Sequence, residues 1–466
     1  MSERRLARAR GQTVTAVGTV VAVAAALTLL DRAGPPPPAA AGGGAAPSGA
    51  WICPHGGGED WDVSVFLANP GPTPVIARVT GLSDRAPEAA TKVEVPPEST
   101  VPVPAVADVR SAATYVEYFG GWVGAGWVAA SDPAGDGLAA EPCASEASRR
   151  WFLPDGSTQI DEHAFIVIAN PFDATAVLDA AVFTTDRAPI RDEEWTDLVL
   201  RPHRSVALHL NDHVKGEAVT AAEIEVSVGR VVAGSLDVTG GTRIRSALGS
   251  TAASSGAILP EIRGSGQSEL LVLSVADQTI RFGATALTQD LPRPADGLTD
   301  TDHPPQAARA YPVQVSSGPT AVRPFVLDAG DAVTALRVLG PRDDLGSTAG
   351  TSTPAASWLV FPALIGSSAE PAIVLTNDGE VASVATVEIL PREGGTATTP
   401  ITVDVQAHGT AAVPPEFLAS APGSAILVRA TEPIVALSAA AAAGDGRRDD
   451  AGAFALSMGV AVPQTP

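Results

Sequence analysis

The sequence predicts an all-β protein, a tandem array of immunoglobulin-like β-sandwiches that follows one N-terminal transmembrane helix. Three observations support this prediction. Short Val- and Ala-rich runs are bounded by Gly, Pro and Asp, as in chains built from many short strands. Similar landmarks recur about every 100 residues along the body of the chain. Finally, one apolar stretch near the N-terminus is long enough to cross a bilayer.

The N-terminus has the pattern of a membrane anchor. Residues 1–10 are basic, and residues 11–30 contain no charged side chain. A helix of about 20 residues spans the bilayer hydrocarbon, whereas the apolar core of a secretory signal is usually about 7–15 residues long. We expect an uncleaved signal-anchor with a cytoplasmic tail and an extracellular body, because arginines favour the cytoplasmic side. Secretion after cleavage is the alternative. Residues 31–50, rich in Pro, Ala and Gly, predict a semi-extended spacer.

Two landmarks recur in step along the rest of the chain. The first is a Trp-x-x-Pro or related opening, and the second is an apolar run that ends in Asn or Ser. Because Asn tolerates turn backbone and a following Pro presets φ, the second landmark predicts a strand that ends in a turn. The first landmark begins at Trp51, Trp151, Ala257 and Trp358, and the second ends at Asn69, Asn170, Ser274 and Asn377.

This period predicts four domains of about seven strands each, with turns every 8–12 residues, as in immunoglobulin-like sandwiches. We expect β-sandwiches at residues 51–146, 147–252, 253–353 and 354–466, of which the third matches the others least well. A single β-propeller with two blades per repeat is the alternative.

The basic tail, single apolar segment, Pro/Ala/Gly spacer and recurring Trp-x-x-Pro and apolar-Asn-Pro landmarks together resemble an uncharacterised family of exported, membrane-anchored actinobacterial envelope proteins with tandem β-sandwich repeats. The resemblance covers nearly the whole chain. It implies a location and an architecture, and because the family carries no assigned activity, it lends no catalytic residue.

The body of the protein is strongly acidic. The net charge of the chain is −22, and residues 1–30 carry four arginines and one glutamate, so the remainder carries −25. Such a surface repels phosphate backbones, which argues against nucleic acid as a partner. An envelope protein or a cell-wall glycan is the partner that we expect, in addition to the membrane that residues 11–30 cross.

The two cysteines, Cys53 and Cys143, predict one disulfide that joins the two ends of the first sandwich. Free thiols are the alternative. A zinc or cysteine-nucleophile site is not expected, because a metal cluster would need more sulfur or histidine nearby. We therefore predict neither a cofactor nor a metal ligand from this pair.

Three further patterns favour plain structure over chemistry. The run His55-Gly-Gly-Gly58 imitates the oxyanion loop of lipases, but the chain has no G-x-S-x-G elbow to accompany it. His203, His209 and His213 lie close in sequence, yet an alternating strand would place them apart, so solvated side chains are favoured over a metal site. Acidic loops at 132–137, 296–302 and 445–450 lack the calcium-loop pattern.

One cluster of aromatic residues is the candidate binding surface. Aromatic residues make up only 5% of the chain, yet five ring side chains fall within thirteen residues of the first domain. They either form a flat platform for a glycan or a partner protein, or fill the core of that domain. The five are Tyr115, Tyr118, Phe119, Trp122 and Trp127.

From these observations we expect no catalytic residue and a non-catalytic function. The protein would be a membrane-tethered extracellular scaffold or adhesion protein that binds another envelope component, since tandem sandwiches act as rigid spacers and adhesion surfaces. The alternative is an envelope hydrolase with a dispersed carboxylate or metal site, which acids clustered in one inter-domain cleft with a raised pKa would favour.

Overall fold

The computed structural model describes residues 48–463. Gaps fall at 88, 132–136, 254–255, 262–267, 314–318, 328–331, 340–344, 363–368, 393–394, 396–397, 421 and 443–453. Residues from Pro47 onward belong to one compact unit. The predicted tail, signal-anchor and most of the spacer lie outside the described residues, as do two of the acidic loops for most or all of their length. Among the residues described, no helix is long and apolar enough to cross a membrane.

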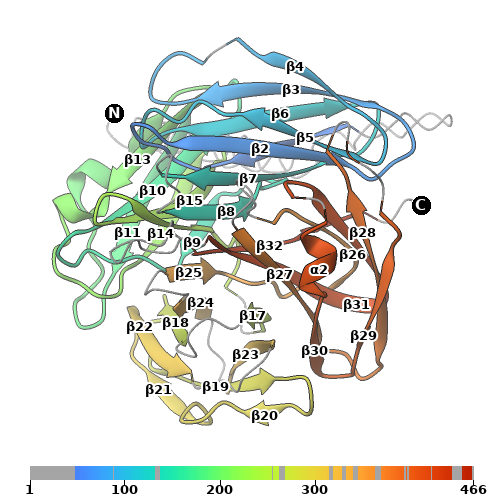
Figure 1. The fold of residues 1–466 in the computed structure, drawn as a ribbon. Coiled ribbons are helices and arrows are strands. Elements are labelled where there is room, and N and C mark those ends of the chain that lie inside the picture. Colours follow the sequence, from blue (N-terminus) through green and yellow to red (C-terminus); the bar gives the residue numbers. More distant parts are fainter. Residues whose placement is uncertain are drawn as a thin grey trace, which may run out of the picture. The chain divides into compact units, whose positions relative to one another are not determined.

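The described residues confirm the all-β class (Figure 1). We divide the strands into four segments. Segment 1 contains β1 (Gly49–Cys53), β2 (Asp62–Asn69), β3 (Val75–Leu82), β4 (Thr91–Val95), β5 (Ser99–Pro104), β6 (Ala113–Phe119), β7 (Gly124–Ala130) and β8 (Leu138–Pro142). Segment 2 contains β9 (Arg150–Leu153), β10 (Glu162–Asn170), β11 (Ala176–Phe183), β12 (Leu198–Leu200), β13 (Arg204–His209), β14 (Ala221–Val228), β15 (Val232–Thr239) and β16 (Arg243–Leu248), with short 3-10 helices η1 (Glu193–Trp195) and η2 (Leu210–Asp212).

Segments 3 and 4 complete the body. Segment 3 contains β17 (Leu259–Glu261), β18 (Ser268–Ser274), β19 (Ile280–Leu287), β20 (Arg293–Pro294), β21 (Thr301–His303), β22 (Ala307–Val313), β23 (Thr320–Val326), β24 (Ala332–Leu339) and β25 (Leu345–Thr348). Segment 4 contains β26 (Ala355–Val360), β27 (Ala369–Asn377), β28 (Ser383–Leu390), β29 (Ile401–Val405), β30 (Gly409–Ala412), α2 (Pro415–Leu418), β31 (Ala425–Ala442), β32 (Phe454–Met458) and β33 (Val460–Ala461).

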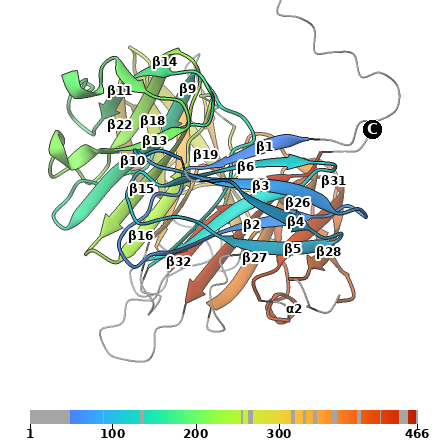
Figure 2. The same cartoon turned by 90° about the horizontal axis from the view of Figure 1, so that it is seen from above.

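The segments share one pattern of strand pairing. In segment 1 the sheets run β1-β6-β3-β4, seen side by side in Figure 2, and β5-β2-β7-β8. Segment 2 repeats this order as β9-β14-β11-β12 and β13-β10-β15-β16. Segments 3 and 4 follow it with an extra edge strand each, and in segment 4 the long β31 belongs to both sheets. All of these pairings are antiparallel.

This order differs from that of an immunoglobulin domain, in which the first strand pairs with the second. Here the first strand pairs with the sixth, and the second pairs with the seventh. Side chains of both sheets, such as Val65 in β2 and Val116 in β6, belong to one hydrophobic core. Each segment is thus a pair of antiparallel sheets on a shared core, and no sheet closes on itself.

The recurring asparagine closes the same turn in three segments. Asn170 Nδ2 donates to the carbonyl oxygens of Ala174 (2.8 Å), Leu200 (3.1 Å) and Arg201 (3.1 Å), and its Oδ1 accepts from Phe172 N–H (3.1 Å). Asn69 makes all four equivalent bonds and Asn377 makes three. Segment 3 has Ser274 instead, whose Oγ accepts from Ala276 N–H (3.3 Å). The shorter serine makes one bond of this turn where the asparagines make three or four.

The recurring tryptophan joins the two sheets of a segment. The indole N–H groups of Trp51, Trp151 and Trp358 each donate to a backbone carbonyl 2.7 Å away. The acceptors are Val123 and Val231, which come just before β7 and β15, and Ile434 in β31. Each bond therefore ties an opening strand to the strand of the opposite sheet.

The four segments contact one another in a closed cycle. A backbone N–H near the start of a strand in one segment donates to a carbonyl just after a strand of the segment before it. The bonds are Ser205 to Ser83 (3.0 Å), Ala308 to Thr184 (3.1 Å), Thr410 to Thr288 (3.1 Å) and, from segment 1 to segment 4, Thr100 to Pro391 (2.9 Å). The first segment therefore contacts the last, which an extended spacer built from tandem sandwiches would not allow.

One strand from each segment also takes part in this cycle: β8, β16, β25 and β32 contact one another in turn. β8 contacts β16 and β32, and β25 contacts both of those strands; Figure 1 shows β8 beside β32. Glu141 in β8 is buried here, 4% exposed, and accepts a hydrogen bond from Leu248 N–H of β16. Burial raises the pKa of this carboxyl well above its ordinary value of 4.5. Ionisation of Glu141 therefore costs the folded protein stability.

We expect Glu141→Gln to stabilise the protein above about pH 4.5 and to change little below it. A raised native pKa contributes stability that is complete below the unfolded pKa and is lost as the pH rises through the native pKa. Glutamine keeps the acceptor for Leu248 and removes the charge. Each tenfold change in the acidity constant corresponds to about 1.4 kcal/mol. Urea unfolding at pH 4.5 and pH 8 measures the difference in free energy of unfolding between the variant and the wild type. A difference that does not grow with pH would contradict the prediction.

Candidate functional site

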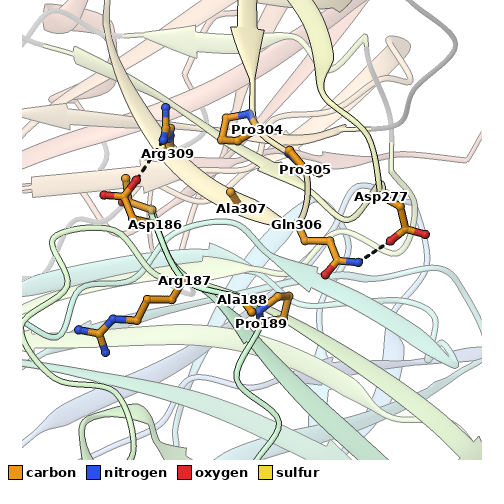
Figure 3. Close-up of a pocket in the computed structure, with 11 residues that line it drawn as sticks. Asp186, Arg187, Ala188, Pro189, Asp277, Pro304, Pro305, Gln306, Ala307 and Arg309 are labelled. Atoms are coloured by element: carbon orange, nitrogen blue, oxygen red, sulfur yellow. Dashed lines mark hydrogen bonds and ion pairs between the residues drawn. The ribbon is translucent and has the colours of Figure 1, made fainter.

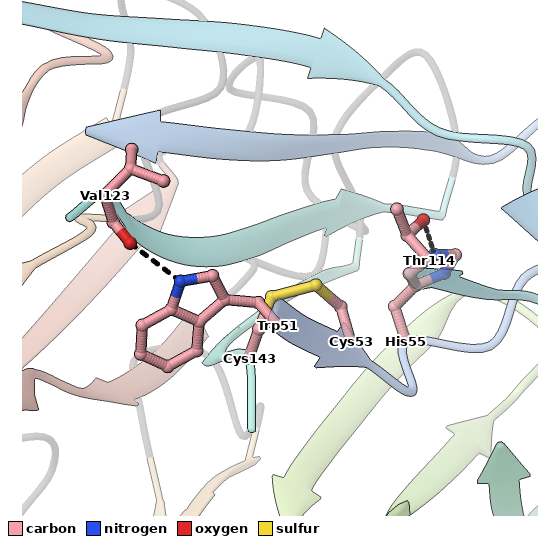
Figure 4. The surroundings of a disulfide bond; sticks show 6 residues. All are labelled: Trp51, Cys53, His55, Thr114, Val123 and Cys143. Atoms are coloured by element: carbon pink, nitrogen blue, oxygen red, sulfur yellow. Dashed lines mark hydrogen bonds between the residues drawn. A yellow bond between two sulfur atoms is a disulfide. The ribbon is translucent and has the colours of Figure 1, made fainter. Parts of the chain in front are cut away.

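The disulfide predicted from the sequence is present (Figure 4). Cys53 ends β1, and Cys143 follows β8, 90 residues later in the chain. Both cysteines are buried. The bond therefore encloses the remaining strands of segment 1 in one covalent loop.

His55, two residues after the disulfide cysteine, is a structural residue. Its ring is fully buried, with Nδ1 2.6 Å from Gly56 O and Nε2 2.9 Å from Thr114 Oγ1. Burial lowers the pKa of the imidazole to about 4, so the ring is neutral at physiological pH. The N–H groups of Gly56 and Gly58 donate to backbone carbonyls at distances of 2.8 and 2.7 Å. Both N–H groups are therefore already hydrogen-bonded within the protein and are not available to a substrate oxyanion.

Asp155 holds the place in segment 2 that His55 holds in segment 1, and it is the centre of a buried ion cluster. Its Oδ2 lies 3.1 Å from Arg245 Nε, and its Oδ1 accepts from Arg337 of segment 3. Arg245 Nη2 also lies 2.8 Å from Asp237 Oδ2. The cluster thus joins segments 2 and 3. Sequence reasoning missed it because its members are up to 182 residues apart.

The two carboxyls of this cluster titrate in opposite directions. Burial would raise the pKa of Asp155, but Arg245 and Arg337 lower it to about 2. Burial raises the pKa of Asp237 to about 6 despite the nearby Arg245. A raised carboxyl pKa between segments is the signal expected of a hydrolase. However, the cavity beside the pair measures about 10 Å³, which holds at most one water.

A cleft lies between segments 2 and 3 (Figure 3). It has a volume of about 580 Å³ and is lined by the loop after β11 and the turn before β22. Asp186 Oδ1 pairs with Arg309 Nη2 across the cleft at 3.1 Å, and Gln306 donates to Asp277. Arg187 is directed to Glu217, 3.2 Å away. The lining combines proline and alanine with charged side chains that are already paired.

A related cleft of about 420 Å³ lies between segments 1 and 2. His203 lies in the turn just before β13, at the position that Gln306 holds just before β22 in segment 3. Its Nε2 lies 2.7 Å from Asp173 Oδ1. This cleft differs in containing two aromatic rings, the half-buried Tyr115 and Phe172, which is 42% exposed. Arg78 and Glu117 line it beside Tyr115, 3.8 Å apart.

The five predicted aromatic residues do not form one exposed platform. Trp127 is 1% exposed and Tyr118 is buried, whereas Trp122 and Tyr115 are half-buried and only Phe119 is exposed. Every residue of β7, which carries Trp127, is buried. The reason is that one face of β7 packs on its own core, and Phe361 of segment 4 covers Gly126 on the strand. Of the five rings, Tyr115 alone lines a cleft among the described pockets.

The three neighbouring histidines have different partners. His203 pairs with Asp173, and His209 Nδ1 lies 3.0 Å from Asp212 Oδ1. His213 bridges two carboxylates, with Nδ1 2.8 Å from Asp192 and Nε2 3.3 Å from Glu194. These last three residues are the one group of three or more metal-binding side chains found among the described residues. Each imidazole nitrogen of His213 thus faces a different carboxylate.

The fold therefore defines an all-β protein built from paired antiparallel sheets with clefts between its segments. Residues 117–289, less than half of the chain, match the model of a family of unknown function, DUF5719. The match crosses the predicted boundaries on both sides of segment 2. No curated protein matches the chain. Among solved structures, the crystal structure of Thermotoga maritima 1070 is 23% identical, with a TM-score of 0.20, over 22% of this chain and 95% of that one. That similarity is too low to support an inference.

Proposed function

We propose that the protein is a non-catalytic, membrane-tethered extracellular scaffold or adhesion protein that binds an envelope glycan in the cleft between segments 1 and 2. The observation that carries this proposal is the exposed ring of Phe172, which lines the cleft together with Tyr115. A volume of about 420 Å³ lies within the range of small-ligand sites, roughly 300–1,000 Å³.

The lining of this cleft suits a neutral sugar. Aromatic rings offer an apolar face against which the C–H face of a sugar packs. Asp173, His203 and Glu117 offer hydrogen-bond donors and acceptors for hydroxyl groups. The body of the protein carries −25, which disfavours an anionic polymer. A neutral cell-wall glycan therefore fits better than a phosphate-rich one.

Two features support an extracellular location. Disulfides form and persist in oxidising compartments, and the Cys53–Cys143 bond is buried within segment 1. The basic residues 1–10 and the uncharged residues 11–30 predict a single membrane crossing with the body outside. The rival function, an envelope hydrolase, gains no support from the Asp155–Asp237 pair, since a substrate has no room beside it.

Co-sedimentation of the full-length chain with isolated, phosphate-stripped cell-wall glycan tests the proposal. We expect Phe172→Ala to weaken binding about two- to tenfold, because a stacked ring contributes about 0.5–1.5 kcal/mol. Phe119→Ala is the matched control, since Phe119 is 44% exposed but does not line the cleft. If the wild-type chain stays in solution, wall binding is wrong. If both variants lose binding equally, the site lies elsewhere.

A further inference from the structure

We propose that His163 and His209 form a binding site for a transition-metal ion of the Zn²⁺ class on the surface of segment 2. This site is independent of the proposed glycan cleft. The two imidazoles come from neighbouring strands, and His163 Nδ1 lies 3.1 Å from His209 Nε2. Imidazole nitrogens suit Zn²⁺, Cu²⁺ and Ni²⁺, whereas Mg²⁺ and Ca²⁺ prefer oxygen ligands.

The strand register brings the two rings together. β10 and β13 are antiparallel, with Phe165 directly opposite His209. His163 lies two residues before Phe165, so all three side chains project from the same face of the sheet. The His209 ring stacks on Phe165, with centroids 4.6 Å apart and planes at 17°. Phe165 thus provides the floor on which the His209 ring is held.

The separation of the two nitrogens fits a shared ion. Zinc binds imidazole nitrogen at about 2.0–2.1 Å, and tetrahedral geometry then places two ligand nitrogens about 3.3–3.4 Å apart. The observed separation of 3.1 Å is slightly shorter, so a shared ion requires the exposed His163 ring to move outward. A hydrogen bond between two neutral rings has a similar separation, and it is the alternative that the experiment must exclude.

Asp212 orients the second ring. Its Oδ1 lies 3.0 Å from His209 Nδ1, so Nδ1 carries the proton and Nε2 presents its lone pair toward His163. A carboxylate that holds the far nitrogen of a ligating histidine is the usual support of a protein metal site. Asp212 is therefore a positioning residue and does not itself need to touch the ion.

The pairing is specific to these two residues. All seven histidines lie in the described part of the chain. The other five are engaged by carboxylates or by buried hydrogen bonds, and none of them faces another imidazole: His55, His203, His213, His303 and His408. The negative body of the protein raises the local concentration of cations around an exposed pair of this kind.

Two protein ligands leave two tetrahedral positions open. β13 is the edge strand of its sheet, so an ion at this pair would tie the edge strand to β10. Water would complete the coordination in the isolated protein. An external carboxylate or imidazole could replace that water, which gives the surface of segment 2 a metal-dependent contact point.

Calorimetric titration of the metal-free full-length chain with ZnCl₂ tests the site. We expect one ion per chain, no binding of Mg²⁺ or Ca²⁺, and at least tenfold weaker Zn²⁺ binding in His163→Ala and in His209→Ala. Asp212→Asn should weaken binding about tenfold, in the range typical of groups that orient metal ligands. His203→Ala, which removes an imidazole paired only with Asp173, should bind Zn²⁺ as the wild type does.

A second readout keeps the test independent of folding. Zn²⁺ should raise the melting temperature of the wild type and of His203→Ala, but not that of His163→Ala. The side chain of His163 is exposed, so its removal should leave the fold intact. If wild-type protein does not bind Zn²⁺, or if His163→Ala binds it equally well, the pair is only a hydrogen bond and the proposal is wrong. If His213→Ala alone abolishes binding, the ion sits with Asp192 and Glu194, which also overturns the proposal.

Discussion

Replacing Arg245 by methionine is expected to lower the free energy of unfolding by about 3–5 kcal/mol, because it leaves two buried carboxylates without their shared partner. Arg245 lies against Asp155 at 3.1 Å and Asp237 at 2.8 Å, and all three side chains are less than 7% exposed. Methionine has a similar length and fills much of the same space. The loss in free energy of unfolding should therefore come chiefly from the unpaired carboxylates. Urea unfolding at pH 7 measures it.

Arg78→Met is the matched control. Arg78 pairs with Glu117 at 3.8 Å, but their side chains are 56% and 32% exposed. An exposed pair of this kind contributes about 0–1 kcal/mol, so the control should unfold close to the wild type. Equal losses in the two variants would contradict the idea that burial makes the Arg245 cluster costly to break.

The cluster also predicts a pH dependence. Asp155 has a pKa lowered to about 2, so the stability that it contributes is present above its ordinary pKa of 3.8 and is lost as the pH falls toward 2. In Arg245→Met this arginine no longer opposes the effect of burial on either carboxyl. We therefore expect the deficit of the variant to begin to shrink as the pH falls toward 6, where Asp237 takes up its proton, and to shrink further toward pH 2, where Asp155 follows.

Local signals in the sequence predicted the parts of the fold that local chemistry determines. Asn170 was expected to end a strand in a turn, and its amide closes that turn with four hydrogen bonds. Cys53 and Cys143 were expected to pair, and they do. Both predictions rest on side chains whose role is set by a few neighbouring residues or by elimination. The four-domain division is compatible with the strand order but remains a prediction.

Features that depend on contacts between segments could not be predicted in this way. Trp127 was named in the candidate surface because five ring side chains fall within thirteen residues of the sequence, with the core of the first domain as the other interpretation. In the structure Trp127 is 1% exposed in the core, and Phe361, more than 200 residues away, covers the neighbouring Gly126 on the other face of β7. His209 was compared with His213, four residues on, whereas its partner is His163 across the sheet. A one-residue change of register would separate that pair, and the sequence alone does not specify the register.

Reduction of the disulfide is expected to lower the free energy of unfolding by about 4–5 kcal/mol in the loop-entropy model. Cys53 and Cys143 close a loop with a sequence separation of 90, which includes every strand of segment 1 from β2 to β8. Opening that loop gives the unfolded chain far more conformations and leaves the packing of the native sheets unchanged. Denaturant unfolding with and without dithiothreitol measures the loss.

The double variant Cys53→Ala/Cys143→Ala separates the cross-link from the reductant. Both cysteines are buried, so the alanines add a small packing loss to the loss of the cross-link. The variant should therefore be at least as destabilised as the reduced wild type, and dithiothreitol should not change it further. Because segment 1 contacts segment 2 and segment 4, its early opening would also expose both neighbouring interfaces. If reduction left the denaturant midpoint of the wild type unchanged, those interfaces, rather than the cross-link, would hold segment 1 together.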